Sequence, residues 1–265
     1  IERGADVNLP YSDGITPLFY AIGQNQPQIA ALLIERGADV NLPYSDGITP
    51  LMFTIGLRQY QIAALLIERG ADVNSTAHTF SGQTLLIDAC LQGQLEMATF
   101  LVEHGADVNL QPFHGCDTAL KSTLFIPDDR LMERLRAEGA NKSMERILEF
   151  FKLLIDHGAD VNCQSSLSGN TILMEAAEKG YTDIVRLLID HGANVNLKHS
   201  FGNTALMLAS KKGHADVVQL LIGHGANANL KDYRGRTALK LASENGHREI
   251  VQILSQHTSC CCVIQ

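Results

Sequence analysis

The 265-residue sequence has no tryptophan, and aromatic residues make up only 6% of it. It contains no apolar run of the roughly 18 residues that a membrane-spanning helix needs. It also has no Met at position 1 and no signal-peptide pattern, so we expect that it starts inside a longer protein. With 45% hydrophobic and 19% charged residues, the composition predicts a folded chain with a large core.

Positive charge is scarce in the first part of the chain. Residues 1–120 hold 4 Lys or Arg and 13 Asp or Glu, a net charge of −9, whereas residues 121–265 hold 17 and 16. A protein built only to bind nucleic acid would be basic, so we expect no nucleic-acid partner. Cys90, Cys116 and Cys163 are too far apart in sequence for a disulfide framework, which favours reduced thiols in the cytoplasm.

A 33-residue repeat organises the sequence. The stretch "IERGADVNLPYSDGITPL" at 1–18 returns letter for letter at 34–51, and residues 11–43 share 25 of 33 positions with 44–76. A period of this length predicts stacked units, none of which can bury its apolar face alone. Each unit has a turn glycine followed, after one residue (two residues at Gly115), by Thr. These glycines are Gly14, Gly47, Gly82, Gly115, Gly169, Gly202 and Gly235. A second series precedes Ala and Asp or Asn: Gly37, Gly70, Gly105, Gly158, Gly192 and Gly225.

Each unit is predicted to contain a turn, a short helix, a tight loop, a longer helix and a terminating glycine. The Thr-Pro pairs at 16–17 and 49–50 place an N-cap hydroxyl before a proline at the first helical position. Gly37 and its equivalents stand where a helix C-cap favours a left-handed residue. The stretch "QIAALLIERG" predicts one apolar stripe of Ile29, Leu32 and Leu33.

The "G-x-TPL" stretches at 14–18 and 47–51, the "GADVN" runs and the period resemble the ankyrin repeat family over nearly the whole chain. The resemblance implies an all-α solenoid of seven helix-pair repeats of about 33 residues with short hairpin fingers. Residues 1–10 would be the end of a truncated upstream repeat, 11–257 the repeats, and 258–265 a flexible cysteine-rich tail. The family's Pro is absent after the second repeat, which we expect to loosen some helix starts without changing the fold.

One repeat is too long, because Gly105 and Gly158 are 53 residues apart. Aligning Gly139 with the other terminating glycines would bury Arg134 and Arg136, at a high cost in free energy. We therefore expect "MERILEFFKLLIDHG" at 144–158 to be the second helix, and about 122–142 to be an insertion with its own short helix. The insertion is either a tolerated surface lobe or one that contacts a partner.

The sequence has no Walker loop, His-Glu-x-x-His, Gly-x-Ser-x-Gly or kinase motif, so we expect no enzymatic activity and no cofactor. A histidine precedes four of the terminating glycines: His104, His157, His191 and His224. Stacked repeats place such residues about 10 Å apart, too far to share one zinc ion. We interpret them as structural residues at helix ends rather than as metal ligands.

Aromatic residues recur at the turn tips: Tyr11, Tyr44, Phe80, Phe113, Phe201 and Tyr233, with Leu167 in between. In the family that the sequence resembles, these tips are fingers, and the concave face made by fingers and first helices binds other proteins. The aromatic residues are therefore candidate partner anchors, together with the basic residues Lys198, Lys231 and Arg234. The alternative is that the rings only pack on neighbouring fingers and the charges only solvate the surface.

The last four residues, Cys262-Val263-Ile264-Gln265, resemble a prenylation box in which a final Gln favours farnesyl. Cys260 and Cys261 would suit palmitoylation, and stable anchoring needs such a second signal. The basic surface of the last repeats could face anionic lipid. The alternative is a chance tail without modification.

Together these features predict a non-catalytic adaptor that binds a protein partner and is held at a cytosolic membrane face by lipidated Cys262. Two alternatives stay open: a plain interaction module with an inert tail, and the regulatory end of a larger enzyme, channel or secreted effector. The resemblance also implies that asparagines in the "ADVN" runs correspond to hydroxylation substrates in animals: Asn41, Asn74, Asn109 and Asn162.

Overall fold

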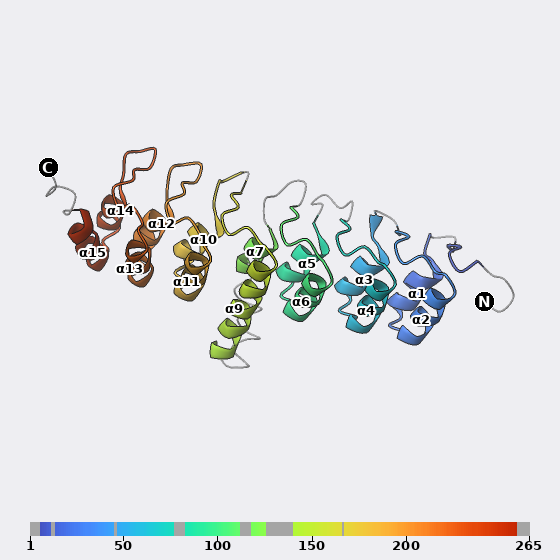
Figure 1. Ribbon diagram of the computed structural model, residues 1–265. Helices are drawn as coiled ribbons and strands as arrows, with labels where there is room; N and C mark the ends of the chain where they lie inside the picture. Colours follow the sequence, from blue (N-terminus) through green and yellow to red (C-terminus); the bar gives the residue numbers. More distant parts are fainter. Residues whose placement is uncertain are drawn as a thin grey trace. The chain divides into compact units, whose positions relative to one another are not determined.

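A computed structural model describes residues 6–11, 14–44, 47–76, 83–111, 118–125, 140–165 and 167–258 of the chain. The chain divides into two compact units, residues 1–114 and 115–265. Within the described ranges the regular elements are helices, apart from one isolated bridge between Thr76 and Thr84. This is the all-α architecture that the repeat predicts (Figure 1).

Unit 1 stacks helices in successive pairs. They are α1 (Pro17–Gly23) with α2 (Pro27–Glu35), α3 (Pro50–Gly56) with α4 (Tyr60–Glu68), and α5 (Leu85–Leu91) with α6 (Leu95–Glu103). First helices pack on first helices, α1 on α3 and α3 on α5, and α2 packs on α4. Each repeat therefore buries its apolar face against its neighbours.

Unit 2 is built in the same way. Its elements are α7 (Ala119–Ser122) with the 3-10 turn η2 (Thr123–Phe125) and α9 (Ala140–Asp156), α10 (Ile172–Lys179) with α11 (Thr182–Asp190), α12 (Ala205–Lys212) with α13 (Ala215–Gly223), and α14 (Ala238–Glu244) with α15 (Arg248–Thr258). Helices α10, α12 and α14 form one row, and α9, α11, α13 and α15 form a second. The loops that precede α12 and α14 project beyond the first row (Figure 1).

Threonine hydroxyls cap most of the first helices. Each accepts a hydrogen bond from the backbone N–H three residues later at Thr16, Thr49, Thr84, Thr171, Thr204 and Thr237. Where Pro is absent, at Thr84, Thr171, Thr204 and Thr237, the hydroxyl cap is kept, because it does not depend on the proline. Thr118 is the described exception, since it makes no side-chain cap bond.

The glycine after each second helix has the predicted left-handed conformation. At Gly37, φ is 89°, and the Gly37 N–H donates to the carbonyl of Ile34 at 3.0 Å. The next N–H, that of Ala38, donates to the carbonyl of Leu33 at 2.9 Å. These bonds satisfy the last helical carbonyls, which explains why each second helix ends at this position.

The predicted apolar stripe of α2 is only partly correct. Leu33 is buried, but Ile29 is 46% and Leu32 is 39% exposed. In the next repeat the residue equivalent to Ile29 is Ile62, which is only 1% exposed. The difference arises because α2 covers this face of α4, whereas no helix in the described residues precedes α2 to cover its own.

Asparagine side chains link successive repeats within each unit. The side-chain amide donates to the carbonyl of the terminating glycine one repeat later at 3.0–3.2 Å, and its oxygen accepts the N–H two residues beyond that glycine at 2.7–2.9 Å. The asparagines are Asn8, Asn41 and Asn74 in unit 1, and Asn162 and Asn196 in unit 2. Each asparagine thus gives a carbonyl and an N–H of the next glycine loop a hydrogen-bond partner within the protein, in place of water. These bonds set the spacing between the two repeats at the glycine loops.

The second helix of the long repeat lies where the sequence places it, with Phe150, Phe151 and Leu154 buried. Its start differs, because α9 begins at Ala140, and residues 122–125 also lie in α7 and η2. The apolar stripe predicts which residues of this helix are buried, but not where the helix begins. No Gly or Pro stands between residues 140 and 144, so nothing in the sequence prevents the helix from starting before residue 144. Residues 126–139, with the short helix expected there, lie outside the described residues.

The asparagine links give a first prediction. Replacing Asn196 by Ala removes the bonds to Gly225 and Asn227, so the free energy of unfolding should fall by about 1–2 kcal/mol. Asn196→Asp keeps the accepting oxygen and loses only the donor, so its loss should be smaller. Urea denaturation followed by circular dichroism measures both, and equal stability of Asn196→Ala and the unsubstituted chain would contradict the role given to this side chain.

Candidate functional site

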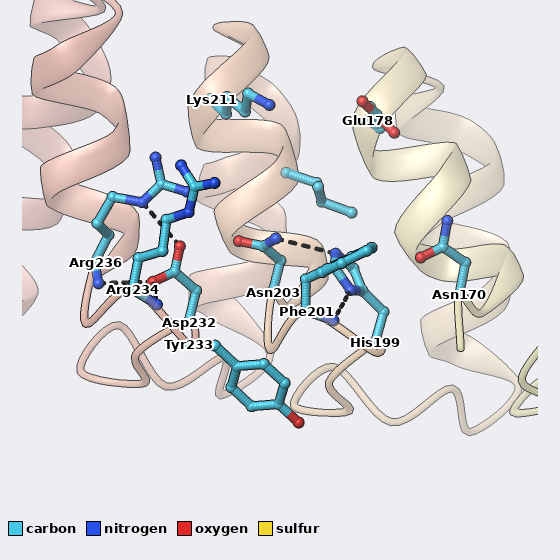
Figure 2. A pocket seen from close by; sticks show the side chains of 11 residues that line it. Asn170, Glu178, His199, Phe201, Asn203, Lys211, Asp232, Tyr233, Arg234 and Arg236 are labelled. Carbon is cyan, nitrogen blue, oxygen red and sulfur yellow. Dashed lines mark hydrogen bonds and ion pairs between the residues drawn. The ribbon is translucent and has the colours of Figure 1, made fainter. Parts of the chain in front are cut away.

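A groove in unit 2 lies between two fingers and the first helices α10 and α12. Its volume is about 460 Å³. The side chains that line it come from α10 and Asn170 just before it, from α12, and from the fingers 199–203 and 232–236 (Figure 2). It therefore occupies the face where the resemblance placed a protein-binding surface.

His199 organises the first finger. It is 8% exposed, and its Nδ1 accepts the N–H of Phe201 at 2.8 Å. This bond requires Nδ1 without a proton, so the neutral ring carries its proton on Nε2, which lies 3.0 Å from Nδ2 of Asn203. Because an N–H cannot donate to an NH2 group, this contact is a hydrogen bond only with the Asn203 amide turned so that its oxygen accepts from Nε2. Burial lowers the pKa of His199 and outweighs the opposite effects of Glu178 and of a backbone contact. The neutral ring thus holds the finger closed.

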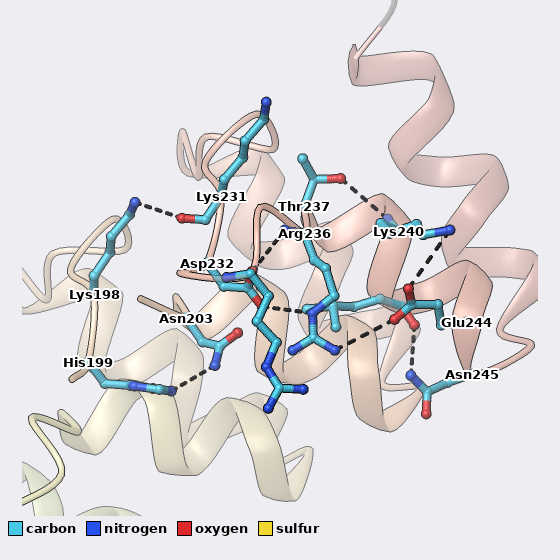
Figure 3. Close-up of polar contacts among 12 residues, drawn as sticks. Lys198, His199, Asn203, Lys231, Asp232, Arg236, Thr237, Lys240, Glu244 and Asn245 are labelled. Atoms are coloured by element: carbon cyan, nitrogen blue, oxygen red, sulfur yellow. Dashed lines mark hydrogen bonds and ion pairs between the residues drawn. The ribbon is translucent and has the colours of Figure 1, made fainter. Parts of the chain in front are cut away.

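Asp232, one repeat later, likewise accepts backbone N–H groups and holds the second finger closed. Its Oδ1 accepts the N–H groups of Arg234 at 2.9 Å and Arg236 at 2.8 Å, and its Oδ2 accepts Nε of Arg236 at 2.9 Å (Figures 2 and 3). Burial raises the pKa of Asp232, but these donors together outweigh it and lower the pKa. The ionised carboxylate therefore fixes the backbone of this finger.

Hydrogen bonds also join neighbouring fingers. Ser200 N–H donates to the carbonyl of Ser168 at 2.9 Å, and Tyr233 N–H donates to that of Phe201 at 3.2 Å. Lys198 Nζ donates to the carbonyl of Lys231 at 2.9 Å (Figure 3). Lys198, a candidate partner contact from the sequence, is thus a bridge between two fingers in this structure.

Close approach of the backbone requires glycine at one finger. At Gly202, φ is +83°, and an added Cβ would lie 2.9 Å from Cδ1 and 3.0 Å from N of Tyr233. At the equivalent Gly235, with φ of +75°, nothing lies within 4 Å of such a Cβ. The finger 199–203 is therefore pressed against its neighbour, and Gly202 makes that contact possible.

Two aromatic side chains stand on these fixed fingers. Phe201 is 70% exposed and packs edge-on against the ring of His199, with 5.7 Å between centroids. Tyr233 is 77% exposed on the next finger. Both side chains are among those that line the groove (Figure 2). The structure thus brings together two of the aromatic residues that the sequence singled out.

The positively charged side chains of the groove differ in whether they already form an ion pair within the chain. Arg236 pairs with Asp232 at 2.9 Å and with Glu244 at 3.7 Å. Arg234 and Lys211 also line the groove, both are exposed, and neither side chain makes an ion pair or hydrogen bond with the described residues. These two cations are therefore available to an acidic group. Lys231 is exposed as well, but it is not part of the groove lining.

The other predicted aromatic sites differ from this pair. Tyr11 is 58% exposed and contacts Tyr20 edge-on, whereas Tyr44 is half-buried and packs on Phe19 with 5.7 Å between ring centroids. The packing of Tyr44 agrees with the alternative that some rings stiffen the stack. Phe80, Phe113 and the tail cysteines Cys260, Cys261 and Cys262 lie outside the described residues.

The four histidines before the terminating glycines each contact their own helix. Nδ1 of His104, His157, His191 and His224 lies 2.8–2.9 Å from the carbonyl oxygen four residues earlier. These contacts agree with their interpretation as structural residues at helix ends.

Sequence reasoning missed His199 and Asn203, and it counted Asp232 and Lys211 only in the net charge of the last repeats, without a role in the site. A signal for His199 and Asp232 was present, because both stand three residues before a turn glycine, in "HSFG" and "DYRG", 33 residues apart. A polar side chain at this position can accept the N–H two residues later, as Asx-type turns do. Lys211 had no such signal, since only the packing of α12 turns it towards the groove.

Comparison with known proteins identifies the repeats. The family model for ankyrin repeats, in three copies, matches residues 1–77, 43–112, 143–199 and 192–264. The chain belongs to the ankyrin-repeat family. A search of curated protein sequences gave no significant match. Within the described residues of this ankyrin-repeat chain, no helix has the length and apolar content that crossing a bilayer requires.

Among solved structures, the chain resembles the ankyrin repeat domain of Bcl-3, a unique member of the IkappaB protein family. The two are 26% identical, with a TM-score of 0.72, and the match covers 92% of this chain and 100% of the other. The fold is therefore an ankyrin-repeat solenoid, as the sequence predicted. Ankyrin repeats generally mediate protein–protein interaction, and the chain belongs to this general class of function.

The state of His199 gives a pH prediction for the groove. Its pKa in the folded chain lies below the usual value of about 6.5, so the unfolded chain binds the proton first as pH falls. Stability that depends on the neutral ring is present above about pH 6.5 and is lost as pH falls through the lower folded value. Urea denaturation between pH 7.5 and 5 should show a smaller loss for His199→Gln than for the unsubstituted chain, and equal losses would contradict this role.

Proposed function

We propose that the chain is an adaptor whose unit 2 groove binds an extended segment of a partner protein. The observation that carries the proposal is the pair of exposed rings, Phe201 and Tyr233, on fingers fixed by hydrogen bonds. Aromatic anchors on a rigid support lose little conformational entropy on binding, so they supply affinity efficiently.

The free cations define the other half of this recognition. Arg234 and Lys211 line the groove without an internal partner, whereas the acidic residues Asp232 and Glu178 are each neutralised, by Arg236 and by Lys212 at 3.4 Å. A partner segment with an apolar side chain for the rings and a carboxylate for Arg234 would satisfy both features. Arg234 is therefore the residue proposed to select an acidic partner, and Lys231 adds positive charge on the same finger.

Quantitative affinity purification from cells tests this function. Phe201→Ala, Tyr233→Ala and Arg234→Glu should each reduce recovery of the same partner at least about tenfold, the size of a typical hot-spot loss. Matched controls are Tyr60→Ala, on the second helix α4, and Arg186→Glu, on the second helix α11, both exposed and outside the groove.

The two controls should leave recovery unchanged. Equal recovery with all five variants would exclude the groove as the partner site. Circular dichroism of each purified variant separates a loss of binding from a loss of folding.

For the tail, we propose that Cys262 is prenylated and that Cys260 or Cys261 receives palmitate, which would hold the adaptor at a cytosolic membrane face. The support is the order of residues 262–265 and the two neighbouring cysteines. Helix α15 ends at Thr258, so the box follows the last packed element after only a few residues. A prenyltransferase acts on this tetrapeptide at a chain end, so the proposal requires Gln265 to be the natural C-terminus.

Intact mass spectrometry of the chain expressed in eukaryotic cells tests the lipid proposal. A farnesyl-sized mass increase and membrane fractionation should both disappear in Cys262→Ser, whereas Cys163→Ser should retain them. An unmodified mass of the unsubstituted chain would exclude the anchor and leave a binding module with an inert tail. The groove proposal does not depend on this result.

We also propose that residues 1–10 are the end of a further repeat. The described part of this segment supports it, because Asn8 bonds to Gly37 and Asp39 as Asn41 bonds to Gly70 and Asp72 one repeat later. The segment thus already makes the inter-repeat link.

A further inference from the structure

A second groove lies in unit 1, between the first helices α3 and α5. Its volume is about 330 Å³, and its walls are mainly apolar, with Met52, Phe53, Leu57 and Leu85 among the lining residues. Leu57 is 44% exposed at its edge. None of the residues that the sequence singled out as partner contacts lines this groove.

Asp88 is the one charged residue among the described residues that line the unit 1 groove. Its side chain is half-buried, and burial raises the pKa of the carboxyl because the charged form loses water there. The carboxylate makes no ion pair and no hydrogen bond with any described residue. A charge in such surroundings is stabilised by any cation that can reach it.

Unit 2 shows what this position looks like when its cation is internal. Asp88 stands four residues after the cap Thr84, and Glu175 stands four residues after the cap Thr171. Glu175 pairs with Lys121 at 2.9 Å, and both side chains are almost fully buried. Lys121 stands three residues after the cap Thr118 of the preceding repeat.

The residue of unit 1 that corresponds to Lys121 is Met52, three residues after the cap Thr49. Met52 cannot pair with Asp88, and it lines the groove as an apolar wall. The same slot that is filled by an ion pair in unit 2 is thus open, apolar and without its cation in unit 1. None of the described residues supplies a cation to this carboxylate, so the slot can take one from a partner.

We propose that the unit 1 groove is a subsite for an arginine side chain of a partner protein, whose guanidinium pairs with Asp88. A guanidinium fits a carboxylate through two parallel N–H···O bonds and lies readily over an aromatic ring, which Phe53 offers in the lining. The aliphatic stem of the arginine would contact Met52 and Leu57. Residues 1–120 carry a net charge of −9, which attracts a basic segment.

This subsite is separate from the proposed function of unit 2. It takes the opposite charge, and it uses none of Phe201, Tyr233 or Arg234. Failure of either proposal therefore leaves the other intact.

Nuclear magnetic resonance titration of the full chain tests the subsite. The probe is the acetylated, amidated tripeptide Leu-Arg-Leu, and its control carries citrulline, the neutral isostere, in place of arginine. The arginine peptide should shift the signals of Leu57, Leu85 and Asp88 in a saturable way and bind about tenfold more tightly than the citrulline peptide. The pKa of the Asp88 carboxyl should fall when the arginine peptide is bound.

Two variants make the test specific. Asp88→Asn should abolish the preference for arginine over citrulline without loss of helical content, since it removes an unpaired charge. Met52→Lys should supply the internal cation found in unit 2 and block the peptide, whereas Met52→Leu should still bind it.

Three results would overturn the proposal. They are equal affinity for the arginine and citrulline peptides, an arginine preference that survives Asp88→Asn, and shifts confined to unit 2. Equal affinity for a Leu-Lys-Leu peptide would overturn the choice of arginine, because a point charge would then suffice.

Discussion

The asparagine that joins successive repeats within each unit is the contact on which the rest of the structure depends. An isolated helix pair of this length cannot bury its apolar face, so its stability comes from its neighbours. Stacking alone would allow the repeats to slide, because apolar contacts have little direction. The two hydrogen bonds of each asparagine, as at Asn196, do have direction and hold the glycine loop of the next repeat in place.

A fixed repeat spacing allows each unit to support a groove of its own chemistry. In unit 2, backbone hydrogen bonds donated by Ser200 and Tyr233 join neighbouring fingers. The buried side chains of His199 and Asp232 accept backbone N–H groups within their own fingers and so hold each finger closed. The result is a preformed edge with two exposed rings and free positive charge. In unit 1, Met52 stands at the position that the buried Lys121 has in unit 2. The unit 1 groove is therefore apolar, with the single carboxylate of Asp88 among its described lining residues.

The sequence was sufficient to predict the fold, because the period, the Thr caps and the glycine ends are local signals repeated many times. It also predicted the place of Phe201 and Tyr233 on exposed fingers, since the finger tips follow from the same period, whereas their role in binding stays a prediction. It failed at Ile29 and Leu32, because a stripe shows which residues seek burial but not whether a neighbour covers them. Pairings between repeats, such as that of Lys121 with Glu175, depend on distances that a single sequence does not contain.

The proposed binding mode requires that the fingers of unit 2 are ordered before any partner arrives. Hydrogen exchange of the free chain measures this directly at the amides of Ser200 and Tyr233, which donate to neighbouring fingers. The account predicts protection of both by about a hundredfold or more over the exposed Leu167 amide at the adjacent finger. Exchange of Ser200 and Tyr233 at the unprotected rate would show that the fingers are not joined, and would contradict the account.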